Sequence, residues 1–226
     1  GYDSLIIDLR RNPGGLLPAV VDTADLFFSD GLIVGTRGRS PGENQRFTAE
    51  GGIDIPRDMP IVVLIDEGSA SAAEILAGAL KDRDRAYLIG ETTYGKGSVQ
   101  QVRRISTGGF RLTMSRYYTP SGDYIDNNGI EPDLVLEDPE LSDEDLDSLA
   151  RLQEEGRVEQ FVADNPNPTA SQIASFVDRL RADDITLSER RIRKLVRDEV
   201  NQVNNVTEVY DLEFDVVLQR AVELLR

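Results

Sequence analysis

Residues 61–65 read IVVLI, an unbroken apolar run that is followed at once by the small and polar residues DEGSASAA. The run is short, rich in β-branched side chains and bounded by polar residues, which is typical of a buried strand. Behind it, Ile75, Leu76, Ala79 and Leu80 recur at helical spacing, after small residues that can begin a helix. A buried strand that leads directly into a helix therefore predicts an α/β arrangement.

The segments on either side of this pair continue the alternation up to about residue 118. Strands are predicted at residues 5–9, 32–36, 46–49 and 86–89, a helix at residues 16–28, and a hairpin from residues 98–105 and 110–118 closed by the sequence STGG. Alternating strands and helices of this kind indicate an α/β core, which we place at residues 1–138.

The pattern changes near Pro139 to amphipathic helices. Ser142 and Thr169 each stand as N-cap three residues before an Asp or Gln, and two further helical patterns cover residues 188–203 and 211–225. We expect their apolar stripes to be packing faces. Residues 139–226 are therefore predicted to form a helical C-terminal region that packs on the core or joins subunits, so that a homo-oligomer is plausible.

The chain contains no histidine and no cysteine. This absence excludes a Ser-His-Asp triad, a thiol nucleophile, disulfides, and zinc or iron sites built on these residues. A hard cation with oxygen ligands is still compatible with the composition, but no calcium-loop spacing occurs. We therefore expect no metal and no cofactor.

The net charge is −16, from 41 acidic and 25 basic residues. A chain of this charge repels polynucleotides, so a nucleic-acid partner is not expected. No run of 18 apolar residues is present, and we expect no membrane-spanning segment. The chain begins at Gly1 and enters a strand pattern almost at once, which suggests the interior of a longer protein.

The sequence GETTYGKGS, residues 90–98, allows two interpretations of Lys96. Gly90 to Lys96 match the pattern of a phosphate-binding loop, but Gly97 stands where that loop needs Ser or Thr, and a strand pattern follows where it needs a helix. In the second interpretation Lys96 is a general base, provided that burial disfavours its charged form. The flanking Gly95 and Gly97 would let the backbone bring it close to a partner.

Ser71 is the candidate for that partner. It follows the buried strand, stands at or near the N-terminus of the next helix and has alanine on both sides, which is where an exposed nucleophile can lie over backbone amides. N-capping by Ser69 or Ser71 is the commoner use of such residues, and both interpretations are open on this evidence alone.

Several long motifs in the same order resemble the carboxyl-terminal processing (tail-specific) serine peptidases. They are IIDLRRNPGGLL, IVVLIDEGSASAAEILAGALKDRDRA, LIGETTYGKGSVQQ and LTMSRYYTPSGDYIDNNGIEPD, which together span roughly residues 1–136. The closing YDLEFDVVLQRAVELL is similar to the C-terminal tail of these enzymes. The resemblance implies a ClpP/crotonase-like core with a Ser/Lys dyad.

By position, the resemblance implies that Ser71 is the nucleophile and Lys96 the general base. Gln100 matches a residue that positions the lysine amine, and the oxyanion hole would be formed by the amides of Ala72 and of a glycine in the NPGG turn, for which we favour Gly15 over Gly14. We expect Arg10, Asp66 and Glu74 to serve structure and not chemistry.

The activity implied is that of an endopeptidase that cuts proteins or peptides with accessible C-termini, in the periplasm or cell envelope. Members of the family normally carry a PDZ domain ahead of this core, which captures peptide C-termini, and this sequence lacks it. Two alternatives come from other classes: a catalytically idle scaffold or assembly domain, and a nucleotide-binding module that uses Gly90 to Lys96.

Overall fold

The computed structural model describes residues 2–51, 54–137, 141–207 and 209–226. The chain forms two compact units, one made of Gly1–Glu137 with Val217–Arg226 and the other of Asp138–Val216. The boundary predicted between residues 138 and 139 lies outside the described residues. The last helix, which the sequence pattern grouped with the helical region, belongs almost entirely to the first unit.

A parallel sheet forms one layer of the first unit. Its strands are β1 (Leu5–Asp8), β4 (Ile61–Ile65), β5 (Tyr87–Gly90) and β8 (Leu134–Val135), in the order β1-β4-β5-β8. All three strand pairs are parallel, and every residue of β4 is buried. Because the strands are parallel, the loops that follow β1, β4 and β5 all leave from the same edge of the sheet.

An antiparallel sheet forms a second layer. Its strands are β2 (Leu32–Gly38), β3 (Arg46–Thr48), β6 (Ser98–Ile105) and β7 (Gly108–Tyr118), in the order β3-β2-β7-β6, and the short 3-10 helix η1 (Pro41–Glu43) lies between β2 and β3. The turn is shorter than the predicted STGG, because Gly108 and Gly109 belong to β7 and pair with β6. Only residues 106 and 107 make the turn.

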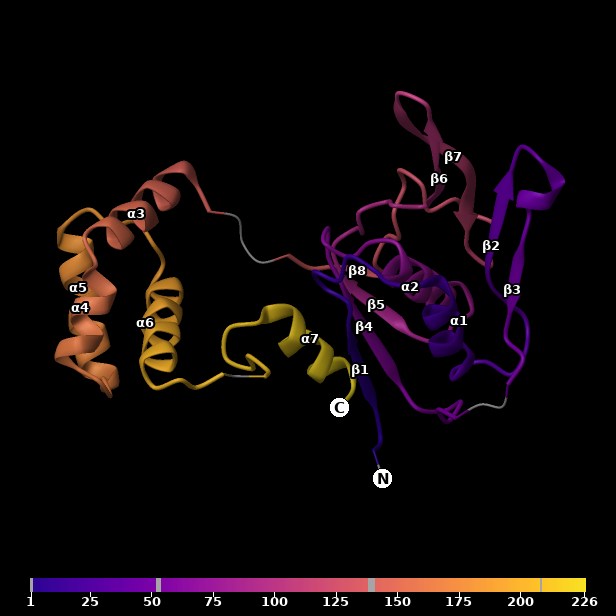
Figure 1. The fold of residues 1–226 in the computed structure, drawn as a ribbon. Coiled ribbons are helices and arrows are strands. Elements are labelled where there is room, and N and C mark those ends of the chain that lie inside the picture. The colour runs from indigo at the N-terminus through magenta and orange to yellow at the C-terminus, as the bar shows by residue number, and fades with distance from the viewer. Residues whose placement is uncertain (1, 52–53, 138–140, 208) are drawn as a thin grey trace. The chain divides into compact units, whose positions relative to one another are not determined.

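Helices α1 (Leu17–Asp25) and α2 (Ala72–Asp82) lie between the two sheets (Figure 1). Both contact β2, and α2 also contacts β5. Their buried faces join the aliphatic side chains of β2 and β4 in one core. The α/β class predicted from the sequence is confirmed. Helix α1 ends earlier than predicted, at Asp25, and Phe27 and Phe28 enter the core from the turn that follows.

The second unit is helical and has a core of its own. Its helices are α3 (Asp143–Glu154), α4 (Arg157–Asp164), α5 (Ala170–Ala182) and α6 (Glu189–Val203). Ser142, Thr169 and Ser188 accept amide hydrogen bonds from the first turns of α3, α5 and α6, so these predicted helix starts are confirmed. Helix α4 was not predicted; Gly156, with a φ of 58°, separates it from α3.

The final helix, α7 (Val216–Leu224), is shorter than the predicted 211–225. It buries Val217, Leu218 and Ala221. Within the described ranges, no helix combines the length and the apolar character needed to cross a bilayer.

Candidate active site

Ser71 occupies a strained position between β4 and α2. Its φ of 58° and ψ of −113° lie outside the extended region that an N-cap residue normally adopts. A non-glycine residue held in such a conformation costs of order 1–3 kcal/mol, which the surrounding structure must offset. A sharp, strained turn from strand to helix is the setting in which a serine nucleophile is commonly presented.

The side chain that fixes this turn is Glu74, which is 0% exposed. Its Oε2 accepts the backbone N–H of Ser71 at 2.7 Å and that of Lys96 at 2.8 Å. Its Oε1 accepts the hydroxyl of Thr93 at 2.7 Å and the N–H of Gly95 at 2.6 Å. Four donors therefore satisfy one buried carboxylate, and they tie the start of α2 to the loop that carries Lys96.

The loop that carries Lys96 is also held from its other side. Gly95 O accepts the N–H of Asn127 at 2.9 Å, and Gly97 O accepts the N–H of Tyr117 at 2.7 Å. A Cβ at Gly97 would lie 2.3 Å from Asp126 N, so only glycine permits this close approach. The backbone on both sides of Lys96 is therefore fixed.

The NPGG turn lies directly against the nucleophile. A Cβ at Gly14, whose φ is +104°, would lie 2.8 Å from both Ala72 N and Ser71 Cβ, whereas a Cβ at Gly15 would meet nothing within 4 Å. Gly14 N donates to Asn12 Oδ1 at 2.9 Å. In the part of the chain that the structure describes, neither Gly15 N nor Ala72 N donates a hydrogen bond, so these two amides are the ones left to receive a ligand oxygen.

Asp66 and Asn12 join this turn to the loop after β4. Asp66 Oδ1 accepts the amides of Arg11 and Gly68 at 2.8 and 3.0 Å, and Ala70 N donates to Asn12 O at 2.9 Å. The fully buried Ser69 adds a bond from its hydroxyl to Leu9 O at 2.7 Å. The carboxyl ends of β1 and β4 are thereby locked together beneath Ser71.

The structure brings the backbones of the predicted site residues together, but it does not join their side chains. Lys96 is exposed, whereas a general base of the expected kind would be buried. The side-chain Nε2 of Gln100 donates to Ser98 Oγ at 3.5 Å. In the described residues no hydrogen bond links Lys96 to Ser71. The fold therefore fixes the backbone of Lys96, whereas its exposed side chain can rotate about its four-carbon stem.

Glu74 is the residue whose importance the sequence interpretation missed, because we expected it to have a purely structural role. The signal was present, since Ser71-x-x-Glu74 is the spacing of a capping box, in which the glutamate accepts the N-cap amide. Its second bond, to Lys96 N, depends on tertiary contact and has no sequence signature. Arg10 binds Asp8 in a bidentate ion pair, with Nη2 2.7 Å from Oδ2.

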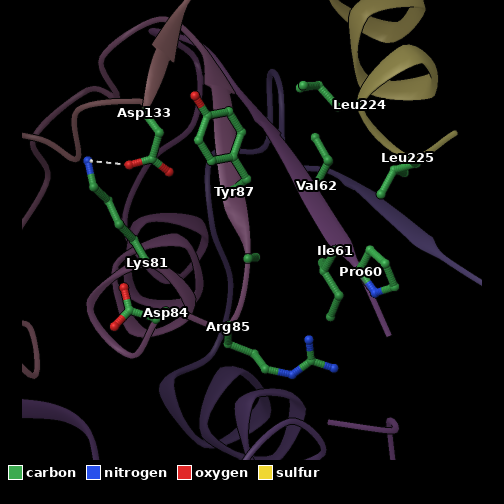
Figure 2. A pocket seen from close by; sticks show the side chains of 11 residues that line it. Pro60, Ile61, Val62, Lys81, Asp84, Arg85, Tyr87, Asp133, Leu224 and Leu225 are labelled. Carbon is green, nitrogen blue, oxygen red and sulfur yellow. Dashed lines mark ion pairs between the residues drawn. The ribbon is translucent and has the colours of Figure 1, made fainter. Parts of the chain in front are cut away.

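A separate pocket of about 590 Å³ lies at the other edge of the parallel sheet, where β4 and β5 begin (Figure 2). It is bordered by Ile61, Val62 and the C-terminal Leu224 and Leu225, and by the ion pair between Lys81 Nζ and Asp133 Oδ1 at 3.4 Å. None of the predicted site residues lines it.

The structure thus places the backbones of Ser71 and Lys96 on one buried carboxylate, with the NPGG turn against Ser71. A family model described as peptidase family S41 matches residues 1–136. A carboxy-terminal-processing protease of Bartonella bacilliformis is 43% identical over 196 residues, which are 86% of this chain and 44% of that protein. A carboxyl-terminal-processing protease of Synechocystis is 46% identical over 154 residues, 68% of this chain and 35% of that protein.

Among solved structures, the photosystem II D1 C-terminal processing protease is similar with a TM-score of 0.53 and 38% identity, over 61% of this chain and 35% of that one. The chain spans less than half the length of each of these relatives. Since the family model covers more than half of this sequence, the chain belongs to peptidase family S41.

Proposed function

We propose that the chain is the catalytic part of a serine endopeptidase that cuts proteins near their C-termini, in the periplasm or cell envelope. One observation carries this proposal: Glu74 Oε2 binds the amides of Ser71 and Lys96 together. The relatives named above are C-terminal processing proteases, and the resemblance of the GSAS and YGKG motifs to that family implies that Ser71 and Lys96 are its dyad.

In the proposed reaction, Ser71 Oγ attacks the carbonyl carbon of the scissile peptide bond, and its proton passes to the neutral amine of Lys96. The amides of Ala72 and Gly15 donate to the oxygen that becomes negative. The C–N bond then breaks as Lys96 returns the proton to the leaving amine, which leaves an ester on Ser71. Water attacks the ester with Lys96 again as base, and the acid product and free Ser71 result.

The step that this structure does not contain is the approach of the Lys96 amine to Ser71 Oγ. Because the Lys96 backbone is fixed and its side chain is exposed, rotation about the side-chain bonds is the movement required. Gln100, which lies in β6 four residues after Lys96, would then hold the amine in the direction of Ser71.

The nucleotide-binding alternative is disfavoured by the same contacts. A phosphate loop aims its free backbone amides at the anion, but the amides of Gly95 and Lys96 already bind the Glu74 carboxylate. The residues after Lys96 form strand β6 and not a helix. A phosphate at this place would meet the buried negative charge of Glu74.

The test is proteolysis of a permanently unfolded protein by the wild type and by Ser71→Ala and Lys96→Ala variants, with products identified by mass spectrometry. We expect cleavage near the substrate's C-terminus by the wild type alone, and an acyl adduct on Ser71 after acid quenching with a slow ester substrate. Cleavage that persists in Ser71→Ala would overturn the proposal. A folded wild type with no turnover and no adduct would favour the scaffold alternative.

A further inference from the structure

Strand β6 offers a free sheet edge that begins beside the candidate active site. It is the last strand of the order β3-β2-β7-β6, and its first residue, Ser98, follows Lys96 by two positions. From Gln100 to Ile105 every residue of β6 is exposed. Figure 1 shows the β6–β7 hairpin extending away from the helices and from the parallel sheet.

An edge strand of this kind presents backbone groups that can pair with another extended chain. In an antiparallel ladder every second residue of β6 directs its N–H and C=O away from β7, toward the free edge. The edge starts next to the nucleophile because the amides of Lys96 and Ser71 share one oxygen of Glu74. A peptide held on Ser71 could therefore reach the start of β6.

The hairpin carries a positive charge that is unusual in this chain. Residues 98–118 contain four arginines and no acidic residue, in a chain whose net charge is −16. Of these arginines, Arg116 pairs with Asp126 at 2.9 Å, and Arg103 Nε donates to Gln101 Oε1 at 3.0 Å. Among the described residues, Arg104 makes no ion pair.

Arg111 lies near Arg104 and adds to this charge. Register pairs Val102 with Arg111 and Arg104 with Gly109, which places both arginines on one face of the hairpin. Among the described residues Arg111, too, makes no ion pair. Two cations on one face, with glycine opposite one of them, leave space and charge for a carboxylate.

We propose that the part of the substrate that follows the cleaved bond binds as a parallel strand along the free edge of β6, with its C-terminal carboxylate at Arg104 and Arg111. This inference rests on the proposed function. It adds a binding site for the C-terminal part of the substrate and the distance from the cleaved bond to the C-terminus. Main-chain pairing of this kind is independent of sequence, and the arginines recognise only the chain end.

The proposal sets how far from the C-terminus the cut falls. Paired strands advance together by about 3.3 Å per residue, so a peptide that reaches from Ser98 to Arg104 contains about as many residues as that part of β6. The carboxylate should therefore lie about five to seven residues after the cleaved bond. Peptides with fewer residues beyond the cut cannot reach the arginines.

The first experiment measures binding alone. The probe is a fluorescein-labelled, twelve-residue peptide of alanine and serine, titrated into the Ser71→Ala variant of the whole chain and followed by fluorescence anisotropy. Single N-methyl groups are placed along its C-terminal half. We expect Kd to rise about tenfold at every second position and to change little between them, because only alternate amides face β6. Equal sensitivity at all positions, or at none, would overturn strand pairing.

The second experiment tests the carboxylate. We expect Arg104→Gln combined with Arg111→Gln to raise Kd about tenfold for the free acid and to leave the C-terminal amide of the same peptide unchanged. The control is Arg46→Gln, which removes one positive charge from β3, the opposite edge strand of this sheet, and should have no effect. Equal binding of acid and amide, with capture of the hairpin by anionic phospholipid vesicles instead, would overturn the proposal in favour of a membrane contact.

The two proposals fail in different ways. If the wild type cleaves substrate but the N-methyl series shows no period of two, the β6 subsite is wrong and the peptidase stands. If the period of two is present in binding but the wild type never cleaves, the subsite stands and the peptidase fails.

Discussion

The backbone amides of Ser71 and Lys96 donate to the same oxygen atom, Oε2 of Glu74, at 2.7 and 2.8 Å. The two nitrogens therefore cannot be farther apart than these two bonds laid end to end. The candidate nucleophile and base come from different loops, after β4 and β5, and this buried carboxylate sets the distance between their backbones.

Replacing Glu74 with Gln should disrupt this arrangement without changing the size of the side chain. One oxygen becomes an NH₂ group, which cannot accept a hydrogen bond and would face two amides that need an acceptor. We expect the free energy of unfolding to fall by about 1–3 kcal/mol and kcat/KM to fall at least tenfold. The matched control is Glu67→Gln, an exposed glutamate in the loop between β4 and α2. Wild-type kcat/KM in Glu74→Gln would show that Glu74 does not position the dyad.

The strain at Ser71 predicts a difference between two inactive variants. Glycine adopts a φ of 58° and a ψ of −113° far more readily than alanine does, so Ser71→Gly should relieve strain that Ser71→Ala keeps. We expect Ser71→Gly to be the more stable by about 1 kcal/mol, or about 2–4 °C in Tm by calorimetry. Neither variant should cleave substrate. A Tm for Ser71→Gly at or below that of Ser71→Ala would mean that the turn is not strained.

The two glycines of the NPGG turn should respond in opposite ways to alanine. Gly14→Ala places a methyl group against Ala72 N and Ser71 Cβ at a φ of +104°, so we expect lower Tm and loss of cleavage. Gly15→Ala meets open space and keeps its amide, so Tm should stay within a few degrees and kcat within about threefold. The reverse order of effects would contradict the assignment of Gly15 as the free donor of the turn.

In the helical unit, stability should depend on pH through Asp211. Hydrogen bonds from Arg197, at 2.6 and 2.8 Å, lower the pKa of Asp211 from 3.8 to about 2, and the amide of Phe214 adds to this effect. A carboxyl whose pKa is lower in the folded state stabilises it above the unfolded pKa, and this contribution disappears as the pH falls from about 4 toward 2.

We therefore expect Asp211→Asn to lower the free energy of unfolding by about 1 kcal/mol at pH 7, a value reduced for the partial solvent exposure of the pair. The difference from the wild type should shrink as the pH approaches 2. Urea melts followed by circular dichroism measure it. Asp198→Asn, which removes the more exposed partner of Arg197, is the control and should change stability less. A difference that is constant from pH 7 to pH 2 would contradict the linkage.

The parts of the fold that depend on local pattern were predictable from the sequence. The strand of residues 61–65 is indicated by its unbroken apolar run, and the helix after it by apolar residues at helical spacing. The starts of α3, α5 and α6 are indicated by their capping Ser or Thr. The separation into two sheets was not predictable, because it depends on β7 pairing with β2, which lies far away in the chain. Strand β8 was missed since two residues carry no period.

The candidate site was likewise predictable only where it depends on local pattern. Ser71 is marked by its place between a strand and a helix, and the need for glycine around Lys96 is visible in the sequence. That Glu74 joins the two residues depends on how the loop after β5 folds back over α2, and no spacing in the sequence encodes this contact. The exposure of the Lys96 side chain depends on tertiary packing, which no local pattern in the sequence describes.

The last prediction concerns Lys96, for which arginine and alanine should be equally damaging. Lys96→Arg keeps the positive charge and approximate length, so a lysine that merely holds an anion would be replaced in part. A general base would not, because guanidinium stays protonated at any working pH and has no lone pair to offer Ser71. We expect kcat/KM to fall to the background of Ser71→Ala in both variants, with Tm within a few degrees because the side chain is exposed.

The pH profile of the wild type makes the same distinction without a mutation. If Lys96 is the base, kcat/KM should rise with pH as its amine loses a proton, and Gln100→Ala should lower the maximum because the amine is then less well directed. Lys81→Arg is the matched control, since Lys81 lies in the same unit but pairs with Asp133 on the far edge of the sheet, and its profile should follow that of the wild type. Proteolysis that survives in Lys96→Arg, or a profile that is flat where lysine titrates, would mean that another group takes the proton from Ser71 and that the dyad assignment is wrong.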